Sequence, residues 1–292
     1  MRHRRPELLP TDRGLQARML LAMLASPAAA VGGVAAFLVL APRQFVLPML
    51  VVTGIGIAKC RGRDDRGTRP HEIAPDEYPG VHAIVERLCL MADLPEPAIV
   101  VVAEDQPNSW VEAPARERPR LHLTSGLLLL LRTDELEAVV AHELSHLAHH
   151  DARLMTVVGG LGDALSEGAR RTSGQWFLWA GHLAAAAIGW VSRLGALSLA
   201  RHRELVADTG AAALTGRPAT LARALRRISG ALDRVPSVDL RQAAARDLFH
   251  LVPVENEKFR PPLMRTHPPL ERRIERLERL EQALHAARAA GH

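Results

Sequence analysis

Apolar residues recur every three or four positions in the segment TDELEAVVAHELSHLAHHD, residues 133–151. The repeat consists of Leu136, Val139, Val140, Leu144 and Leu147, which share one face of a helix. Thr133 suits the N-cap position, and Asp134 and Glu135 put negative charge in the first turn, where the helix dipole favours it. The pattern therefore predicts a helix from Thr133 to Asp151.

Shorter patterns surround this helix. Before it, the sequence predicts a helix at Tyr78–Leu94, strands at Ala98–Ala103, Trp110–Ala113 and Arg118–Thr124, and the start of a helix at Gly126–Leu131. After residue 199 it predicts helices at Ala200–Leu214, Pro218–Leu232, Val238–Leu251 and Pro268–Ala290. The last of these is dense in Glu and Arg, which is typical of a solvated face. The expected fold is mainly α with a small β-sheet.

Two apolar runs precede these elements. Met19–Leu40 carries no charge and is long enough to cross a bilayer core of about 30 Å. Gln44–Ala58 is shorter, and its flanking side chains can snorkel to the interface. The small residues of SPAAA would also suit cleavage of a signal peptide, but the apolar run continues past them. We therefore predict two transmembrane helices over 19–59.

Basic residues lie on the outer flanks of these two runs, whereas the loop between them holds only Arg43. This distribution places both ends on the cytoplasmic side. A further apolar region at 152–199 includes the run Trp176–Ser192. A single crossing there would separate the later helices from residues 133–151, so we predict a membrane-associated hairpin. Asp163 and Glu167 are costly in lipid unless they face protein.

These patterns predict a multi-pass protein of the plasma membrane with a cytoplasmic domain. The expected divisions are a basic tail at 1–18, transmembrane helices at 19–59, a linker at 60–75, the first part of the domain at 76–151, the hairpin at 152–199 and the second part of the domain at 200–292.

Composition fits a chain divided between lipid and water, since 48% of residues are hydrophobic and 24% are charged. The net charge of +5 raises nucleic-acid binding as a possibility. However, the basic residues cluster beside apolar runs, and no segment combines basic with aromatic residues. We therefore expect no nucleic-acid partner. The two cysteines, Cys60 and Cys89, provide no disulfide framework.

Candidate chemistry lies on the predicted helix 133–151. His142 and His146 are four residues apart, so both imidazoles can reach one zinc ion, and Glu143 can act on water as a general base. A five-residue pattern of this kind also occurs on ordinary amphipathic helices, so it needs support from the rest of the chain.

A catalytic zinc site needs a third protein ligand. His150 lies a full turn beyond His146, too far along one straight helix to share the ion. Glu204 is the better candidate, because it lies four residues before Asp208 on one helical face. Glu204 could bind the metal while Asp208 accepts a hydrogen bond from a ligand histidine. The same pair is also common on exposed helices.

The segment LHLTSGLLLLLRTDELEAVVAHELSHLAHHD, together with ARHRELVAD, LFHLVP and RTHPPLERRIERL, resembles the HtpX-like membrane zinc metallopeptidases of family M48, which are relatives of the CAAX prenyl peptidases. The resemblance covers about residues 76–280. It implies an α+β zincin-type domain, one Zn²⁺ per chain held by His142, His146 and Glu204, and Glu143 as the base.

The resemblance also implies roles for two further residues. Asn108 matches the start of an N-A-F element near the edge strand that binds substrate, and His267 matches a histidine that helps to stabilise the oxyanion. His267 could instead be only a residue that precedes the prolines at a helix start. Asn108-Ser109-Trp110 departs from N-A-F, which leaves the substrate preference open.

The expected function is hydrolysis of peptide bonds in membrane or misfolded proteins at the cytoplasmic face. The alternative is a catalytically silent membrane scaffold, although no ligand or base is missing from the motifs. An intramembrane protease would need its zinc helix within lipid, and charged residues bracket this helix at both ends.

Overall fold

A computed structural model describes residues 72–113, 117–149, 179–232, 265 and 267–290, together with isolated helical positions between 28 and 55. The chain divides into two compact units. The first consists of Met1–Asp12, Pro70–Ala152 and Arg201–His292, and the second of Arg13–Arg69 and Arg153–Ala200.

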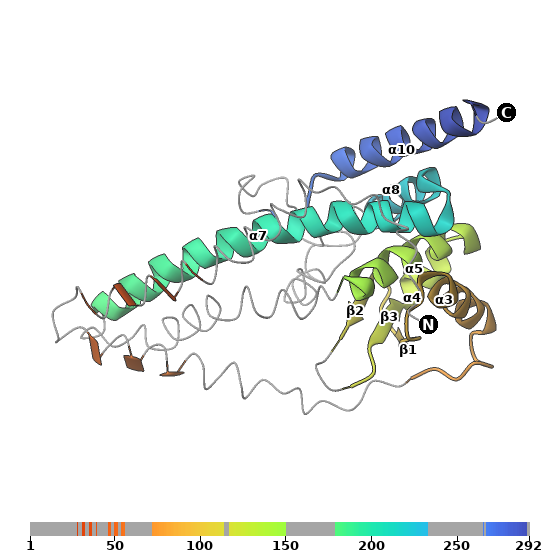
Figure 1. The fold of residues 1–292 in the computed structure, drawn as a ribbon. Coiled ribbons are helices and arrows are strands. Elements are labelled where there is room, and N and C mark those ends of the chain that lie inside the picture. The colour runs from red at the N-terminus through yellow and green to blue at the C-terminus, as the bar shows by residue number, and fades with distance from the viewer. Residues whose placement is uncertain are drawn as a thin grey trace, which may run out of the picture. The chain divides into compact units, whose positions relative to one another are not determined.

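Helices dominate the described part of the chain, with one small sheet (Figure 1). In chain order the elements are α3 (Pro79–Ala92), β1 (Ala98–Val102), β2 (Ser109–Glu112), β3 (Arg120–Thr124), α4 (Ser125–Leu130), α5 (Thr133–Ala148), α7 (Trp179–Thr215), α8 (Pro218–Leu232) and α10 (Leu270–Ala290). The predicted mainly helical fold with a small sheet is thereby confirmed for these residues.

The sheet has the strand order β1-β3-β2. β1 runs parallel to β3, with Val100 opposite His122, and β2 runs antiparallel to β3, with Trp110 opposite His122. An isolated bridge joins Glu72 to Val100 on the other side of β1. Within the described residues β2 is therefore an edge strand, paired on one side only.

Thr124 joins this edge strand to the helices. Its Oγ1 accepts hydrogen bonds from the backbone N–H groups of Asn108 at 2.9 Å and Leu127 at 3.2 Å, and donates to Asn108 O at 3.1 Å. Thr124 thus caps α4 and also holds Asn108, the residue that precedes β2. The position of β2 relative to the helices is set by these buried bonds.

α5 lies at the centre of the first unit, packed against α3, α8 and β2. Its apolar residues from Leu136 to Leu144 are buried, and α3 contributes a stripe from Val81 to Cys89 to the same core. Burial of apolar side chains on several sides of one helix contributes about 1.5–3 kcal/mol for each large side chain. This core holds the backbone of α5 in place.

Helix ends account for most differences from the predicted bounds. α5 begins at Thr133 with Arg132 as its N-cap, so the predicted cap at Thr133 was one residue late. The backbone N–H of Arg132 donates to Glu135 Oε2 at 3.1 Å, which is the bond that a capping box forms with Arg132 as the N-cap. α5 ends at Ala148, because His149 leaves the helical region.

α7 is one continuous helix from Trp179 to Thr215, so the predicted start of a new helix at Ala200 was wrong. The sequence across residues 193–201 contains no proline that would end a helix. Leu197 and Leu199 are buried in this stretch. Residues up to Ala200 belong to the second unit and those from Arg201 to the first.

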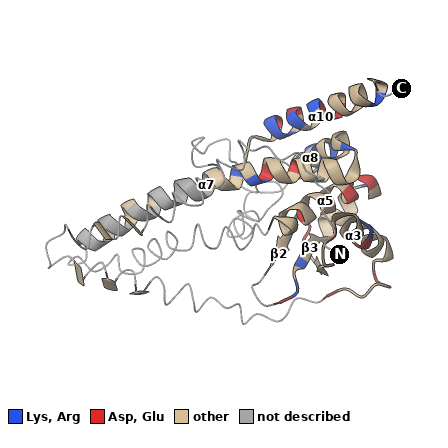
Figure 2. Cartoon of the chain, in the orientation of Figure 1, with Lys and Arg blue, Asp and Glu red and all other residues tan. Residues whose placement is uncertain are grey.

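α10 carries the expected mixture of charges, which alternate along it in Figure 2. Ile274 and Leu277 are buried, and the helix packs on α8. Glu281 accepts a hydrogen bond from the backbone N–H of Ala219 at 2.9 Å, which ties α10 to the start of α8.

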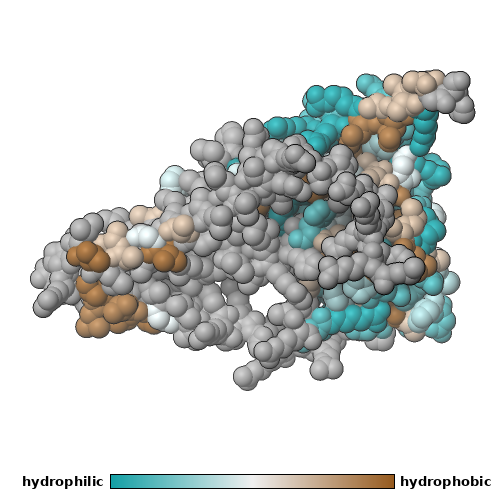
Figure 3. All heavy atoms as spheres, in the orientation of Figure 1, coloured by the Kyte–Doolittle hydropathy of each residue, from teal (hydrophilic) through white to brown (hydrophobic). Residues whose placement is uncertain are grey.

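The second unit exposes apolar side chains. Those described are Val31, Val39, Leu47, Leu50, Val51 and Trp190, with Val39 81% and Leu47 67% exposed. Most of this unit's described residues are brown or pale in Figure 3. No helix among the described residues is both long and apolar enough to cross a membrane. Most of the predicted span 19–59, all of 152–178 and the predicted helix Val238–Leu251 lie outside the described residues.

Gly126 allows a close approach between the start of α4 and the chain that leads into β2. Its N–H donates to Glu104 O at 2.9 Å, and a Cβ at this position would lie 2.0 Å from Asp105 O. We expect Gly126→Ala to lower the free energy of unfolding by about 1–3 kcal/mol, because backbone must move to admit the methyl group.

Gly230→Ala is the matched control, since nothing lies within 4 Å of a Cβ there and the residue is inside α8. This change should raise the stability by about 0.5–1 kcal/mol. Denaturant unfolding of both variants checks the comparison, and equal effects would contradict it.

Candidate active site

α5 brings two histidines and a glutamate into one buried place. His142 is fully buried and Glu143 is 3% exposed, and the rings of His142 and His146 meet edge to face. The Nε2 atoms of the two rings lie 3.1 Å apart. The four-residue spacing therefore turns both Nε2 atoms toward one point, as a shared ligand would require.

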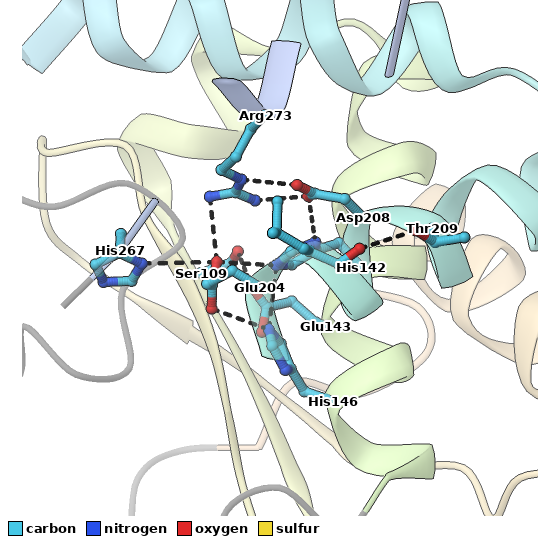
Figure 4. A network of polar contacts seen from close by, with 10 residues as sticks. Ser109, His142, Glu143, His146, Glu204, Asp208, Thr209, His267 and Arg273 are labelled. Carbon is cyan, nitrogen blue, oxygen red and sulfur yellow. Dashed lines mark hydrogen bonds and ion pairs between the residues drawn. The ribbon is translucent and has the colours of Figure 1, made fainter. Parts of the chain in front are cut away.

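Glu204 of α7 faces these two rings (Figure 4). Its Oε1 lies 3.4 Å from His146 Nε2, and its Oε2 lies 3.7 Å from His142 Nε2. The ligand atoms of the three residues all lie within 4.8 Å of one another. The structure thus brings together the three residues singled out in the sequence as metal ligands.

The distances can be tested against the needs of a zinc ion. Zn–N bonds of about 2.0–2.1 Å at tetrahedral angles place neighbouring ligand atoms roughly 3.3 Å apart. The two Nε2 atoms, 3.1 Å apart, lie close to that spacing. Each ring also has one oxygen of Glu204 near it, Oε1 at 3.4 Å from His146 Nε2 and Oε2 at 3.7 Å from His142 Nε2. Two imidazole nitrogens and a carboxylate are also a donor set that zinc accepts. The three residues fit a zinc ion in both spacing and chemistry.

Asp208 lies one turn beyond Glu204 and faces the other side of His142. Its Oδ1 is 3.1 Å from His142 Nδ1, and both side chains are 1% exposed. A carboxylate at this place favours a proton on Nδ1 and leaves the lone pair of Nε2 free for a metal. The structure thus places Asp208 beside His142, whereas its role toward a ligand histidine stays a prediction.

Arg273, from the first turn of α10, binds both carboxylates of α7. Its Nε and Nη2 donate to Asp208 at 2.8 and 2.7 Å, and its Nη1 lies 3.1 Å from Glu204 Oε2. Burial alone would raise the pKa of Glu204, but attraction by Arg273 and contacts with His146 and His267 hold this pKa well below its usual range. Burial would likewise raise the pKa of Asp208, but attraction by Arg273 and the contact with His142 lower this pKa below its usual value. Both groups are therefore ionised at neutral pH.

Glu143 is held from the sheet. Ser109, the first residue of β2, is fully buried and donates a hydrogen bond from Oγ to Glu143 Oε1 at 2.7 Å. A charge-assisted bond of this length restrains the carboxylate and fixes which oxygen remains for other contacts. Figure 4 shows Ser109 and Glu143 beside the histidine pair.

The two residues taken from the resemblance alone lie at different places. His267 is buried, and its Nδ1 lies 3.6 Å from Glu204 Oε2. Asn108 is buried just before β2 and, within the described residues, makes its hydrogen bonds through its backbone. The structure thus brings His267 next to Glu204, whereas Ser109 rather than Asn108 reaches Glu143.

Sequence reasoning missed Ser109 and Arg273. For both residues, the position in the periodic pattern of the sequence could have indicated burial. Ser109 alternates with Val111 on the inward side of β2, and Arg273 occupies a position of the buried stripe of α10 beside Ile274 and Leu277. A polar residue at an inward-facing position must find a partner, so each pattern could have indicated a buried polar contact.

Residues 75–281 match the model of the family described as "Peptidase family M48". The chain belongs to peptidase family M48. The resemblance seen in the sequence is thereby confirmed. Membership supports a protease role, and His142, His146 and Glu204 could bind the metal of a metalloprotease.

The chain is also similar to proteins with the names of proteases and to a solved structure. The chain is 36% identical over 234 residues to "Protease HtpX homolog" of Moorella thermoacetica, covering 74% of this chain and 77% of the relative. It is 35% identical over 299 residues to "Protease HtpX homolog 1" of Streptomyces coelicolor, covering 96% and 97%. The crystal structure of S. mikatae Ste24p is similar with a TM-score of 0.44 and 17% identity, covering 91% of this chain and 67% of that one.

The bond from Ser109 to Glu143 leads to a test of stability. Ser109→Ala leaves a buried carboxylate oxygen without this donor, which costs about 1–3 kcal/mol. We expect the free energy of unfolding to fall by that amount in denaturant titrations.

Ser145→Ala is the matched control on α5. Ser145 Oγ is buried and has no hydrogen-bond partner among the described residues, so its removal should leave stability unchanged or raise it. A loss of stability at position 145 equal to that at 109 would show that the hydrogen bond is not the cause.

Proposed function

We propose that the protein is a membrane-anchored zinc endopeptidase that hydrolyses membrane or misfolded proteins at the cytoplasmic face. The observation that carries the proposal is the convergence of two Nε2 atoms and one carboxylate beside a buried glutamate. Membership of family M48 supports the reaction class.

His142, His146 and Glu204 would hold one Zn²⁺, with Asp208 orienting His142. When bound, Zn²⁺ supplies Lewis acidity, which polarises a peptide carbonyl and makes a water molecule more acidic. The contact of 3.1 Å between Asp208 and His142 Nδ1 supports the orienting role, because it selects the tautomer that leaves Nε2 free.

Glu143 is proposed as the general base. It would take a proton from the attacking water and pass it to the leaving amine. Because Ser109 holds Oε1, the other carboxylate oxygen is the one we assign to proton transfer. His267, buried beside Glu204, is proposed to donate to the oxygen that becomes negative in the transition state.

The edge strand β2 is the proposed place for substrate. Within the described residues its second side has no strand partner, and an extended peptide can pair with such an edge through backbone hydrogen bonds. Asn108 precedes this strand and Ser109 begins it, and Ser109 contacts the proposed base. A peptide aligned on β2 would therefore run close to Glu143.

Membrane anchoring is supported by the exposed apolar side chains of the second unit. Val39 and Leu47 are among the most exposed large apolar residues described. Water disfavours such surfaces, whereas lipid tails accept them. The basic segments that flank residues 19–59 support a cytoplasmic position for the rest of the chain.

The proposed base can be tested with Glu143→Gln. In detergent-purified full-length protein we expect casein cleavage to fall about 10²–10⁴-fold, the usual contribution of a general base, while zinc content stays at one ion per chain. Glu137→Gln is the control, because Glu137 lies on the same helix and pairs with Arg87 at 3.1 Å. It should retain full activity.

Two other outcomes are informative. Zinc bound by the wild type without cleavage of casein or of a denatured membrane protein would favour the silent scaffold. An absence of zinc, even after reconstitution, would rule out the proposed centre.

Membrane anchoring predicts that the expressed protein stays in the membrane pellet after washing with alkaline carbonate and leaves it only with detergent. The reason is that apolar contact with lipid is insensitive to pH, unlike peripheral charge contacts. Accessibility of a C-terminal tag to protease only in inside-out vesicles would place residues 201–292 in the cytoplasm. Release by carbonate alone would contradict the anchor.

A further inference from the structure

Arg273 is 1% exposed, which is unusual for an arginine. It is one of four arginines between 272 and 279 on α10, and its neighbour Arg272 is exposed. Nothing in the reaction proposed above uses Arg273. Its burial therefore calls for a reason.

The reason lies in the charge around it. Glu204 and Asp208 are both buried, and Glu143 stands nearby, so three carboxylates lie in one interior place. Each buried charge is costly unless it is paired and hydrogen-bonded. Arg273 contributes a permanent positive charge, because guanidinium does not lose its proton in proteins.

The guanidinium of Arg273 contacts two carboxylates with different nitrogens. One side, Nε and Nη2, makes a bidentate pair with Asp208 at 2.8 and 2.7 Å. The remaining nitrogen, Nη1, lies 3.1 Å from Oε2 of Glu204. A single rigid plane thus fixes both carboxylates relative to each other (Figure 4).

Each of those carboxylates touches a different part of the candidate metal centre. Asp208 stands 3.1 Å from His142 Nδ1, and Glu204 offers its own oxygens beside both rings. Displacement of Arg273 would therefore alter the position of Glu204 directly and that of His142 through Asp208. Lysine cannot replace it, because one ammonium group cannot reproduce the planar fork.

We propose that Arg273 is a positioning residue of the metal centre, which holds Glu204 and Asp208 in the geometry that binds the ion and thereby makes the docking of α10 a condition for tight metal binding. The inference rests on the proposed zinc site. It extends that site to a helix that supplies no metal ligand.

The placement of Arg273 depends on packing at a distance from the site. α10 starts with backbone bonds from Arg272 and Arg273 to Pro269 O, at 3.0 and 3.2 Å. Leu277 is buried one turn further on, and Glu281 holds the helix to Ala219. These contacts carry the guanidinium to the carboxylates.

The test compares full-length, detergent-purified wild type with Arg273→Lys, Arg273→Gln and the exposed control Arg272→Gln. The measurement is the dissociation constant for Zn²⁺, obtained by competition with a chromophoric chelator. It is repeated as the Zn²⁺-dependent rise in melting temperature. We expect both Arg273 variants to bind Zn²⁺ about 10–100-fold more weakly, as for other outer partners of metal ligands, and the control to match the wild type.

A merely structural role would give a different result. It would lower the melting temperature of the metal-free protein and leave the affinity of the folded protein for Zn²⁺ unchanged. Arg273→Lys keeps the buried positive charge, so it decides the matter if Arg273→Gln fails to fold. Wild-type affinity in Arg273→Lys would overturn the inference. Failure of the wild type to bind Zn²⁺ would instead overturn the proposed function.

Discussion

Three carboxylates buried close together require positive charge, and this requirement governs the centre of the first unit. At 4 Å, two like charges repel by about 4 kcal/mol at an effective dielectric constant of 20. Arg273 supplies one positive charge to Glu204 and Asp208. A divalent ion between His142, His146 and Glu204 would supply two more and bring the group of Glu143, Glu204, Asp208, Arg273 and metal to neutrality. Not only the spacing of the three donor side chains but also the net negative charge around them therefore favours a bound cation.

The same requirement explains why distant segments of the chain meet at this point. α5 provides two rings and the proposed base, α7 provides two carboxylates and α10 provides the arginine. Each segment alone would bury a charge without compensation, at a cost of several kcal/mol. Packing of α5 on α8 and of α8 on α10 brings the charges together, so hydrophobic burial and electrostatic pairing stabilise the same arrangement.

Spacing within a single helix was the part of the site that the sequence could predict. His142 with His146, and Glu204 with Asp208, follow from the helical repeat, as does the buried stripe of α3. Contacts between segments could not be obtained in this way. Ser109 and Glu143 are 34 residues apart, and Arg273 and Asp208 are 65 apart, so only the folded chain defines these pairs. The N-cap of α5 and the unbroken course of α7 were missed because caps and helix continuity depend on side-chain contacts that a periodic pattern does not contain.

The proposed base and the proposed metal ligand on α7 are supported by different elements. Ser109 restrains Glu143 from the sheet, whereas Arg273 restrains Glu204 from a helix. Catalytic groups must be held to within about 0.5 Å of their productive positions, and each of these restraints acts on a different group. In the proposed mechanism, a disturbance of β2 would therefore affect proton transfer before metal binding, and a disturbance of α10 would affect metal binding first. Because β2 is also the strand on which a peptide is proposed to pair, the restraint on the base lies where the substrate would arrive, and substrate alignment and proton transfer share one structural element.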